Sequence, residues 1–414
     1  MRVNVFGATI SGLVTGACLA ETGNQVTVIG TLPKEIAEPG LKKLISKEID
    51  EERLVIADAF DPEAEFHIIA YGAGDCMKAL DDAKKLAKNV SPESNLLIRS
   101  NLSWHLVEDI ASVSGLDFIV NPDFSPEGNM IQGFTRPDRI IVGSDSERAK
   151  ADFKRLIAPF NRYRDVIIEM SPQSATLTKY ATNALIATRI SLMNEFASVA
   201  EAMGADIEEV RHGLGSDNRI GFSYLYPGVG FGGDYLERDL QRLQELINET
   251  GSDENLLLAV SNINQAQKDL LFRKLWRHYD CQLADKKIAL WGVSYKPNTN
   301  SIDGAPSLVM IEALIHQGTE VHLYDPKLDD TFKSWMQANL NREQQALIHI
   351  YDDMYECATE CDALCVLTEW KLFWMPDFDK LKQVMRQPMI MDGRNLYDKS
   401  WLQNHGFTYF GIGR

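Results

Sequence analysis

The sequence is poor in basic residues and in long apolar runs. Lys and Arg number 42 against 59 Asp and Glu, and the formal net charge is -17. This balance argues against binding nucleic acid or an anionic membrane, because both need a basic surface. No apolar run reaches membrane-spanning length, and the N-terminus lacks a signal-peptide pattern. We therefore expect a cytoplasmic protein that binds neither nucleic acid nor membrane, while a local basic pocket for phosphate stays open.

Cysteine is also scarce, and its spacing does not fit a zinc motif. There are six cysteines and no CxxC pair, and the group Cys357, Cys361 and Cys365 has no His nearby. No metal site is predicted from this pattern. Buried or half-buried thiols in a reducing compartment are the favoured interpretation.

What the chain does contain is two strand–turn–helix–strand units. In the first, residues 1–6 and 25–30 are β-rich and flank a helical pattern at Ser11–Glu21. The second begins at Lys287 and continues through a helix at Pro306–Gln317 to a strand at 320–325. Such units open doubly wound parallel sheets. Further strands are predicted at 66–71, 95–99, 117–120, 139–142, 348–351, 363–367, 389–391 and 409–410.

Helical patterns fill the middle of the chain. Residues 180–203 and 236–275 carry apolar residues at helical spacing, on either side of a loop at 215–234 that is rich in Gly and aromatics. With 414 residues, two or three domains are expected. We predict an α/β protein with two Rossmann-like, doubly wound parallel-sheet domains joined by a central helical segment, which also suggests a dimer interface. The predicted boundaries are 1–173, 174–275 and 276–414.

Ordered segments along nearly the whole chain carry a resemblance to one family. They are GLVTGACLAETGNQVTV (12–28), EPGL (38–41), NPDFSPEG (121–128), PDRIIVG (137–143), KYATNALIATRISLMNE (179–195), DNRIG (217–221), PGVGFGG (227–233), YKPNTNS followed by APSLVMIEAL (295–314), YDP (324–326), TEW (368–370), DGRN (392–395) and YFGIGR (409–414). The chain resembles the UDP-glucose/GDP-mannose dehydrogenase family in these segments. A lone GxGxxG motif would be weak evidence for a family, but a dozen segments in the same order are very specific evidence.

The resemblance implies an N-terminal NAD domain, a dimerising helical linker and a C-terminal domain for the nucleotide of the substrate. It also implies oxidation of a sugar 6-hydroxyl to a carboxylate by two hydride transfers to NAD. In the family, a cysteine captures the aldehyde as a thiohemiacetal, and water hydrolyses the thioester that follows. The ligand implied is a UDP-sugar, with UDP-glucose preferred to UDP-N-acetylhexosamine or GDP-mannose.

The segments that match the substrate side are intact. Lys179 and Asn183 lie four residues apart on one helix face. A cation beside an amide suits a developing alkoxide. From the spacing alone, however, a solvated lysine on a helix surface is the favoured interpretation. The resemblance gives catalytic roles to Lys179, Asn183, Glu127 and Asp239, while Asp123 stands where the family usually has glutamate. It gives substrate-binding roles to Phe124, Arg219, Phe222, Tyr224, Gly230, Phe231, Gly232, Gly233, Lys296 and Arg394.

Two alternatives stay open on this side. The glycines of 230–233 either let backbone N–H groups approach phosphate oxygens or form a flexible turn. Asp325, at the end of the strand 320–325, either meets a ribose hydroxyl or forms a strand-end turn with Pro326. Arg219 matches an arginine that reaches the substrate of a neighbouring subunit in the family.

The segments that match the redox side depart from the family. The cofactor-binding fingerprint consists of Gly7, Thr9, Ile10, Ser11 and Gly12, and Thr9 stands where a glycine lets the backbone approach pyrophosphate. The ribose-binding acidic position after the second strand is Gly30, and the stretch from Gly30 to Glu38 is short. The family's two threonine-containing turns are Tyr71-Gly72-Ala73-Gly74 and Ser100-Asn101-Leu102-Ser103, and Asp303 replaces an arginine.

The nucleophile is missing as well. Tyr235 stands at the cysteine position of the family's GFGGSCFPKD motif, and a phenol with a pKa near 10 forms no thioester. The losses gather on the NAD and thioester side. They favour a UDP-sugar-binding homologue with lost or altered oxidation. An active NAD-dependent dehydrogenase with a variant site, reaching UDP-glucuronate or stopping at the aldehyde, and a structural protein that binds neither ligand are the alternatives.

Overall fold

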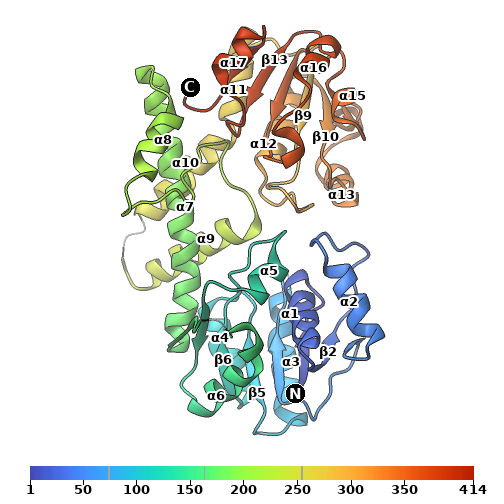
Figure 1. The fold of residues 1–414 in the computed structure, drawn as a ribbon, viewed down its shortest axis with the longest axis vertical. Coiled ribbons are helices and arrows are strands. Elements are labelled where there is room, and N and C mark those ends of the chain that lie inside the picture. Colours follow the sequence, from blue (N-terminus) through green and yellow to red (C-terminus); the bar gives the residue numbers. More distant parts are fainter. Residues whose placement is uncertain (73–74, 163, 253–254) are drawn as a thin grey trace. The chain divides into compact units, whose positions relative to one another are not determined.

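The computed structural model describes residues 1–72, 75–162, 164–252 and 255–414. The chain divides into two compact units, residues 1–180 and 181–414. The long helix α7 (Pro172–Met203) begins in the first unit and continues into the second. Figure 1 shows helices on the two faces of each unit's sheet. No helix in the described ranges is both long and apolar enough to cross a bilayer.

The first unit is built on an eight-stranded sheet in the order β3-β2-β1-β4-β5-β6-β7-β8. Neighbouring strands pair in parallel except β6 and β7, which meet antiparallel through Val120 and Gly143. The strands are β1 (Arg2–Phe6), β2 (Gln25–Ile29), β3 (Leu54–Ala57), β4 (Phe66–Ile69), β5 (Asn95–Ile98), β6 (Asp117–Val120), β7 (Ile140–Gly143) and β8 (Ile167–Met170).

Two apolar clusters cover the two faces of this sheet. Because side chains alternate along a strand, Leu97 packs into one cluster while Leu96 and Ile98 pack into the other. The first cluster includes residues of α1 (Ile10–Glu21), α2 (Leu41–Asp50), α5 (Met130–Thr135) and α6 (Glu147–Ile157). The second includes residues of α3 (Cys76–Asn89) and α4 (Trp104–Ser114). A short 3-10 helix, η2 (Ala158–Phe160), follows α6.

The second unit begins with the helical part of the chain. After α7 come α8 (Ile207–Gly215), α9 (Asp234–Glu249), α10 (Asn255–Lys268) and α11 (Leu270–His278). The pattern predicted as one long stretch over 236–275 is therefore three helices. Helix α9 ends just before Gly251, whose φ of 72° lies in the left-handed region that favours glycine and does not continue a right-handed helix. Asp269 separates α10 from α11.

A six-stranded, all-parallel sheet follows, in the order β11-β10-β9-β12-β13-β14. Its strands are β9 (Lys287–Trp291), β10 (Glu320–Tyr324), β11 (Ile348–Ile350), β12 (Ala363–Val366), β13 (Met389–Asp392) and β14 (Thr408–Phe410). The helices are α12 (Pro306–His316), α13 (Asp330–Asn339), α14 (Arg342–Gln345), α15 (Met354–Ala358), η3 (Lys371–Phe373), α16 (Phe378–Val384) and α17 (Lys399–Asn404).

The predicted fold class is confirmed: two α/β domains with parallel sheets are joined by a helical segment. The strands predicted from the sequence are present, with ends shifted by one or two residues. Strands β3 and β8 were not among the predictions. They are the two edge strands of the first sheet, and β8 carries the charged residue Glu169 where a buried strand would be apolar.

Candidate nucleotide and substrate sites

The fingerprint turn between β1 and α1 keeps two of its three glycines. Gly7 has a φ of 107°, a conformation that favours glycine. A Cβ added to Gly12 would lie 2.0 Å from the carbonyl oxygen of Gly7. The first and last glycines therefore serve the close approach of helix to strand that dinucleotide-binding folds require.

Thr9, at the middle position, is the N-cap of α1. Its hydroxyl donates to the carbonyl oxygen of Ala70 at 2.7 Å and accepts from the backbone N–H of Gly12 at 3.1 Å. Its methyl group lies 3.8 Å from where a Cβ on Gly72 would stand. The side chain thus occupies the space between this turn and the one after β4, and it satisfies an N–H that a pyrophosphate would otherwise meet. Ala73 and Gly74, also predicted to depart from the family, lie outside the described residues.

The strand-end position Gly30 has no room for an acidic side chain. Its φ is 138°, and an added Cβ would lie 3.1 Å from the Cβ and 3.2 Å from the nitrogen of Ala8. A carboxylate for the adenosine ribose therefore needs a different backbone path here. Thr9 and Gly30 thus both depart from the usual dinucleotide-binding arrangement of this turn.

Asp123 lies at the centre of a polar cluster beyond the ends of β5 and β6. Its carboxylate accepts from the Ser11 hydroxyl at 2.5 Å and from the Ser125 N–H at 3.0 Å, and it forms an ion pair of 2.9 Å with Arg99. Burial would raise the pKa of the Asp123 carboxyl, but the Arg99 guanidinium and these hydrogen bonds outweigh it, so the pKa lies below the usual value. Arg99 also donates to the side chain of Asn121 at 2.7 Å.

Lys179 is buried and belongs to the same cluster. Its ammonium group donates to the backbone carbonyl of Asp123 at 2.7 Å and lies 5.2 Å from the centre of the Phe124 ring. The guanidinium of Arg139 lies 4.4 Å from the same ring, so Phe124 is in contact with two cations. The burial and contacts of Lys179 therefore exclude the alternative that it is a solvent-exposed lysine on the helix surface. Glu127 lies close by in the same loop, half-buried.

Glu38 holds the loop in place, a role that the sequence did not predict. Its two carboxylate oxygens accept from the N–H groups of Gly128 and Met130 at 2.8 and 2.7 Å. Burial raises the pKa of Glu38 in spite of these hydrogen bonds. The EPGL motif contains the residue, but nothing in that motif indicates a partner about 90 residues away.

In the second unit, Asn183 and Asp239 lie together. The Asn183 amide donates to the Asp239 carboxylate at 2.6 Å, and both side chains are buried. Arg242, one turn along α9, lies 3.7 Å from the other carboxylate oxygen. Two predicted catalytic residues are thus brought into direct contact.

The glycine-rich loop before α9 packs tightly against its own unit. A Cβ on Gly232 would lie 2.7 Å from the carbonyl oxygen of Gly304, and one on Gly233 would lie 2.6 Å from the Tyr295 ring. Phe231 is buried, and its N–H donates to the Asn264 side chain at 2.8 Å. Gly230 has a φ of 89°. These glycines are required by packing as well as by any approach of a phosphate, so the flexible-turn alternative loses its basis.

Tyr235 occupies the first turn of α9 with 43% of its surface exposed. Two residues on, Glu237 forms an ion pair with the buried Lys268, to which Asn264 adds a hydrogen bond of 3.3 Å. The position of the expected thiol thus carries a half-exposed phenol.

The predicted residues of the loop 216–227 lie at the surface. The Arg219 side chain is 88% exposed and pairs with Asp217 at 2.6 Å. Phe222 and Tyr224 are both exposed, and Tyr224 has a φ of 57°. None of these three is in contact with the other predicted substrate residues in the part of the chain that the structure describes.

The last two predicted substrate cations lie at the ends of the strands of the second sheet. Arg394 follows β13, donates to the carbonyl of Leu367 at 2.7 Å and pairs with Glu369 at 3.1 Å. Lys296 is half-buried, with its ammonium 5.4 Å from the ring of Tyr295. The hydrogen bond from Arg394 to the Tyr295 carbonyl, at 3.3 Å, brings these residues to one edge of the sheet.

Asp325 serves the turn rather than a ribose. Its carboxylate accepts from the N–H groups of Val293, Ser294 and Lys327 at 2.8 to 2.9 Å and from the indole of Trp370 at 3.2 Å. Four donors from the protein occupy this buried carboxylate, so the structural alternative is favoured.

The cysteines supply no activated thiol near these residues. Burial raises the pKa of Cys361 and of Cys18 to about 12, and it raises the pKa of Cys365 further. Cys281 is exposed, in the turn after α11. No group of three or more His, Cys, Asp or Glu side chains suited to a metal ion is found within the described ranges.

Three family models match the chain. Residues 1–161 match the NAD binding domain, residues 173–266 the central domain and residues 289–399 the UDP binding domain of the UDP-glucose/GDP-mannose dehydrogenase family. The succession of the three matches accounts for most of the chain.

Relatives of known name match over the full length. A UDP-glucose 6-dehydrogenase of Pseudomonas aeruginosa is 35% identical over 447 residues, covering 100% of this chain and 98% of the relative. The UDP-glucose 6-dehydrogenase TuaD of Bacillus subtilis is 30% identical, with 100% and 93% covered. A UDP-glucose dehydrogenase structure from Pyrobaculum islandicum shares the fold with a TM-score of 0.85 at 22% identity, covering 100% of this chain and 97% of the other. The chain therefore belongs to the UDP-glucose/GDP-mannose dehydrogenase family.

Proposed function

We propose that this protein binds a UDP-sugar, UDP-glucose by preference, and has lost or altered the NAD-dependent oxidation. The observation that carries the proposal is Tyr235 at the position of the nucleophile. A tyrosine hydroxyl is a poor nucleophile at neutral pH and cannot form a thioester, so the covalent route to the carboxylate is closed. The buried thiols offer no replacement, because their raised pKa values keep them protonated.

The cofactor side supports the same proposal. The Thr9 hydroxyl occupies the Gly12 N–H, and the crowding of Gly30 by Ala8 leaves no place for a ribose-binding carboxylate. NAD is the cofactor that the family implies, and its binding here is weakened or lost. Without bound NAD there is no acceptor for a hydride, so we derive no oxidation step for this chain.

The substrate side supports ligand binding. Lys179 is fixed on the loop of Asp123 and Phe124, where its ammonium would stabilise an oxyanion. Asn183 is oriented by Asp239 and would assist a water molecule. The cations Lys296 and Arg394 at the strand ends suit a diphosphate, which a guanidinium binds bidentately. Glu127, in the same loop as Asp123 and Phe124, would act as a general acid or base.

We also propose that the protein is a homodimer in a reducing cytoplasm. Leu185, Leu192, Phe196, Val199 and Met203 form an exposed apolar stripe along α7, at a spacing that places them on one face. In such a dimer the exposed Arg219 would reach the substrate of the other subunit. The five described cysteines are all free, which suits a reducing compartment. We propose three functional segments, 1–173, 174–275 and 276–414.

The alternative is an active NAD-dependent UDP-glucose 6-dehydrogenase with a variant site, forming UDP-glucuronate or stopping at the aldehyde. The identity of 35% over the whole chain to a relative of that name favours it. Stopping at the aldehyde needs NAD but no thiol, so Tyr235 alone does not oppose it.

Calorimetric titration of the full chain with NAD and, separately, with UDP-glucose tests the proposal, together with absorbance of NADH at 340 nm. We expect saturable binding of UDP-glucose, no saturable heat with NAD up to millimolar concentration and no NADH. Steady NADH formation from UDP-glucose would establish the alternative. Binding of neither ligand by folded protein would favour a structural role. Arg394→Ala serves as the control for the UDP-glucose site, because it removes the diphosphate cation without touching the fingerprint turn.

A further inference from the structure

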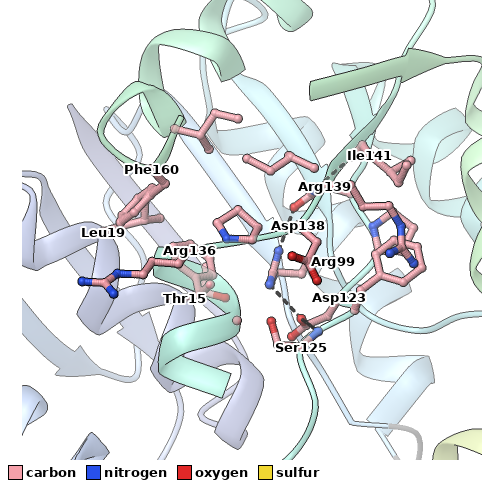
Figure 2. A pocket seen from close by; sticks show the side chains of 18 of the residues that line it. Thr15, Leu19, Arg99, Asp123, Ser125, Arg136, Asp138, Arg139, Ile141 and Phe160 are labelled. Atoms are coloured by element: carbon pink, nitrogen blue, oxygen red, sulfur yellow. Dashed lines mark hydrogen bonds and ion pairs between the residues drawn. The ribbon is translucent and has the colours of Figure 1, made fainter. Parts of the chain in front are cut away.

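The first unit contains a cavity of about 310 Å³, which is at the lower end of the size of small-molecule sites. It lies between the sheet and the segment 122–141, with α1 and α6 completing the walls. Figure 2 shows Arg99 and Asp123 on one side of it, with Thr15 and Leu19 of α1 nearby.

Two buried polar groups of the cavity wall lack a protein partner. Arg99 donates from its two terminal nitrogens to Asn121 and Asp123, but no described residue accepts a hydrogen bond from its Nε. The hydroxyl of Thr15, which is 1% exposed, also has no partner within the described ranges. Native proteins leave few buried polar atoms unsatisfied. Two of them lining one cavity indicate a ligand with a hydrogen-bond acceptor.

The remaining walls are mixed. Leu19, Phe134, Phe153, Leu156 and Phe160 form an apolar part, while Asn129, Gln132, Arg136, Asp138 and Arg139 also line the cavity. The Phe134 ring lies 5.0 Å from the Arg99 guanidinium and 5.1 Å from the Phe160 ring. The cavity therefore combines the unpartnered donors of Arg99 and Thr15 with a partly aromatic wall, which suits a molecule with a polar head and a ring or short alkyl body.

The charges around the cavity favour an anionic head. Arg99 and Asp123 neutralise each other, while Arg136 and Arg139 line the cavity against a single further acid, Asp138. The lining is thus left with one positive charge, which one carboxylate would balance. A carboxylate is also the acceptor that an arginine Nε–H binds most strongly.

This cavity shares Asp123 and Phe124 with the substrate loop described above, but not the other predicted catalytic and cofactor residues of this unit. Its lining contains none of Gly7, Thr9, Gly12, Lys179 or Glu127. The ion pair of Asp123 and Arg99 belongs to its wall, with Ser11 of the fingerprint turn on the opposite side of the carboxylate.

We propose that the cavity is a binding site for a small monocarboxylate with an aryl or short alkyl body. The carboxylate accepts from Arg99 Nε and from the Thr15 hydroxyl, and the body packs against Phe134, Phe153 and Leu156. The site does not depend on the proposed loss of oxidation, because its lining contains no residue of the fingerprint turn, although it shares Asp123 and Phe124 with the substrate loop.

Titration of the full-length protein with benzoate and hexanoate, against benzyl alcohol and hexanol as uncharged matches, tests the proposal. We expect saturable binding of the carboxylates and binding of the alcohols weaker by roughly tenfold or more, since a hydrogen bond to a charged group contributes more than a neutral one. Thr15→Val keeps the branched shape and removes the hydroxyl, and it should weaken carboxylate binding with little effect on the alcohols. Arg99→Lys keeps the charge but has one nitrogen in place of three and therefore no Nε–H group, and it should weaken carboxylate binding further.

The controls separate this site from the others. Phe160→Trp adds volume at a partly exposed position of the wall and should block both classes of probe, while circular dichroism verifies that each variant is folded. UDP-glucose should bind equally with and without benzoate. The proposal is overturned if folded wild-type protein shows no saturable binding, if alcohols bind as well as carboxylates, if benzoate competes with UDP-glucose, or if a crystal soaked in benzoate holds only water in the cavity.

Discussion

The side-chain oxygen of Thr9 lies 3.1 Å from the backbone nitrogen of Gly12 and accepts its hydrogen bond. In a phosphate-binding turn that N–H group, at the positive end of the helix, points at the ligand. Here the protein supplies its own acceptor, so a dinucleotide would have to displace a hydroxyl that also donates to Ala70. Thr9 therefore opposes dinucleotide binding in two ways. Its hydroxyl accepts the hydrogen bond of the Gly12 N–H, and its side chain fills space in the turn.

Replacing Thr9 with glycine is expected to increase affinity for NAD. The change frees the Gly12 N–H and removes the methyl group that faces Gly72, while replacing the N-cap threonine by glycine costs only about a few tenths of a kcal/mol of stability. Calorimetry with NAD at millimolar concentration measures the gain. Thr31→Gly, at an exposed position after β2, is the matched control and should leave NAD binding unchanged. Equal NAD binding by wild type and Thr9→Gly would show that Thr9 does not obstruct the cofactor.

Tyr235→Cys alone is not expected to produce NADH from UDP-glucose. The half-exposed position would make the new thiol accessible, which labelling with iodoacetamide verifies. The cofactor turn would still be occupied by Thr9, so the hydride has no acceptor. Turnover by this single variant, measured at 340 nm, would mean that the NAD site works and that the thiol was the sole loss.

Asp123→Asn is expected to destabilise the first unit at neutral pH, by about 3 kcal/mol or more, because it leaves the buried Arg99 without its counter-ion. The folded pKa of Asp123 is lowered, so the carboxylate's contribution is complete above the ordinary Asp pKa and is lost as the pH falls below it. The difference between wild type and variant should therefore shrink as the pH falls from 5 towards 3. Urea unfolding at each pH measures it.

Asp138→Asn provides the control for that experiment. Asp138 is exposed and belongs to the same segment, so its loss should change stability by no more than about 0.5 kcal/mol. A difference for Asp123→Asn that stays constant from pH 7 to pH 3 would contradict the assigned role of the charge.

The sequence predicted the fold better than it predicted the geometry of the sites. Short apolar strands such as 95–98 and the helix at Ser11–Glu21 follow from the local sequence pattern, and both are present. The contact of Asn183 with Asp239 and that of Glu38 with Gly128 join residues 56 and 90 positions apart. No local pattern encodes such pairs. The role of Arg99 was missed for the same reason, since its partners become visible only when the ends of β5 and β6 lie side by side.

His67 is expected to make stability depend on pH between about 4 and 6.5. It is fully buried in β4, where burial lowers its pKa from 6.5 to about 4. Its Nδ1 faces the amide of Asn4 at 3.0 Å, and that amide already donates to Asp61, so the ring accepts there and a proton on Nδ1 would meet a donor. The unfolded chain takes up the proton more readily in this interval, so stability falls as the pH falls, by roughly 3 kcal/mol at most.

Unfolding free energies of wild type and His67→Leu at pH 4.5, 5.5, 6.5 and 7.5 test this expectation. The variant lacks the titrating ring, so its stability should vary less over the interval. His105→Leu, which changes another histidine of the first unit, should leave the pH dependence as in wild type. Parallel curves for wild type and His67→Leu would show that the ring protonates without cost in the folded state.

Val199→Glu is expected to convert the proposed dimer into a monomer. Val199 lies within the exposed apolar stripe of α7, where burial against a second copy would leave a glutamate without solvent or a partner. Light scattering after gel filtration should give twice 46.5 kDa for wild type and 46.5 kDa for the variant. Ser198→Glu introduces the same charge on the same helix but away from the stripe, and it should remain dimeric. If the stripe brings Arg219 to the other subunit's substrate, Val199→Glu should also weaken UDP-glucose binding, whereas Ser198→Glu should not. A wild-type monomer would remove the basis for both expectations.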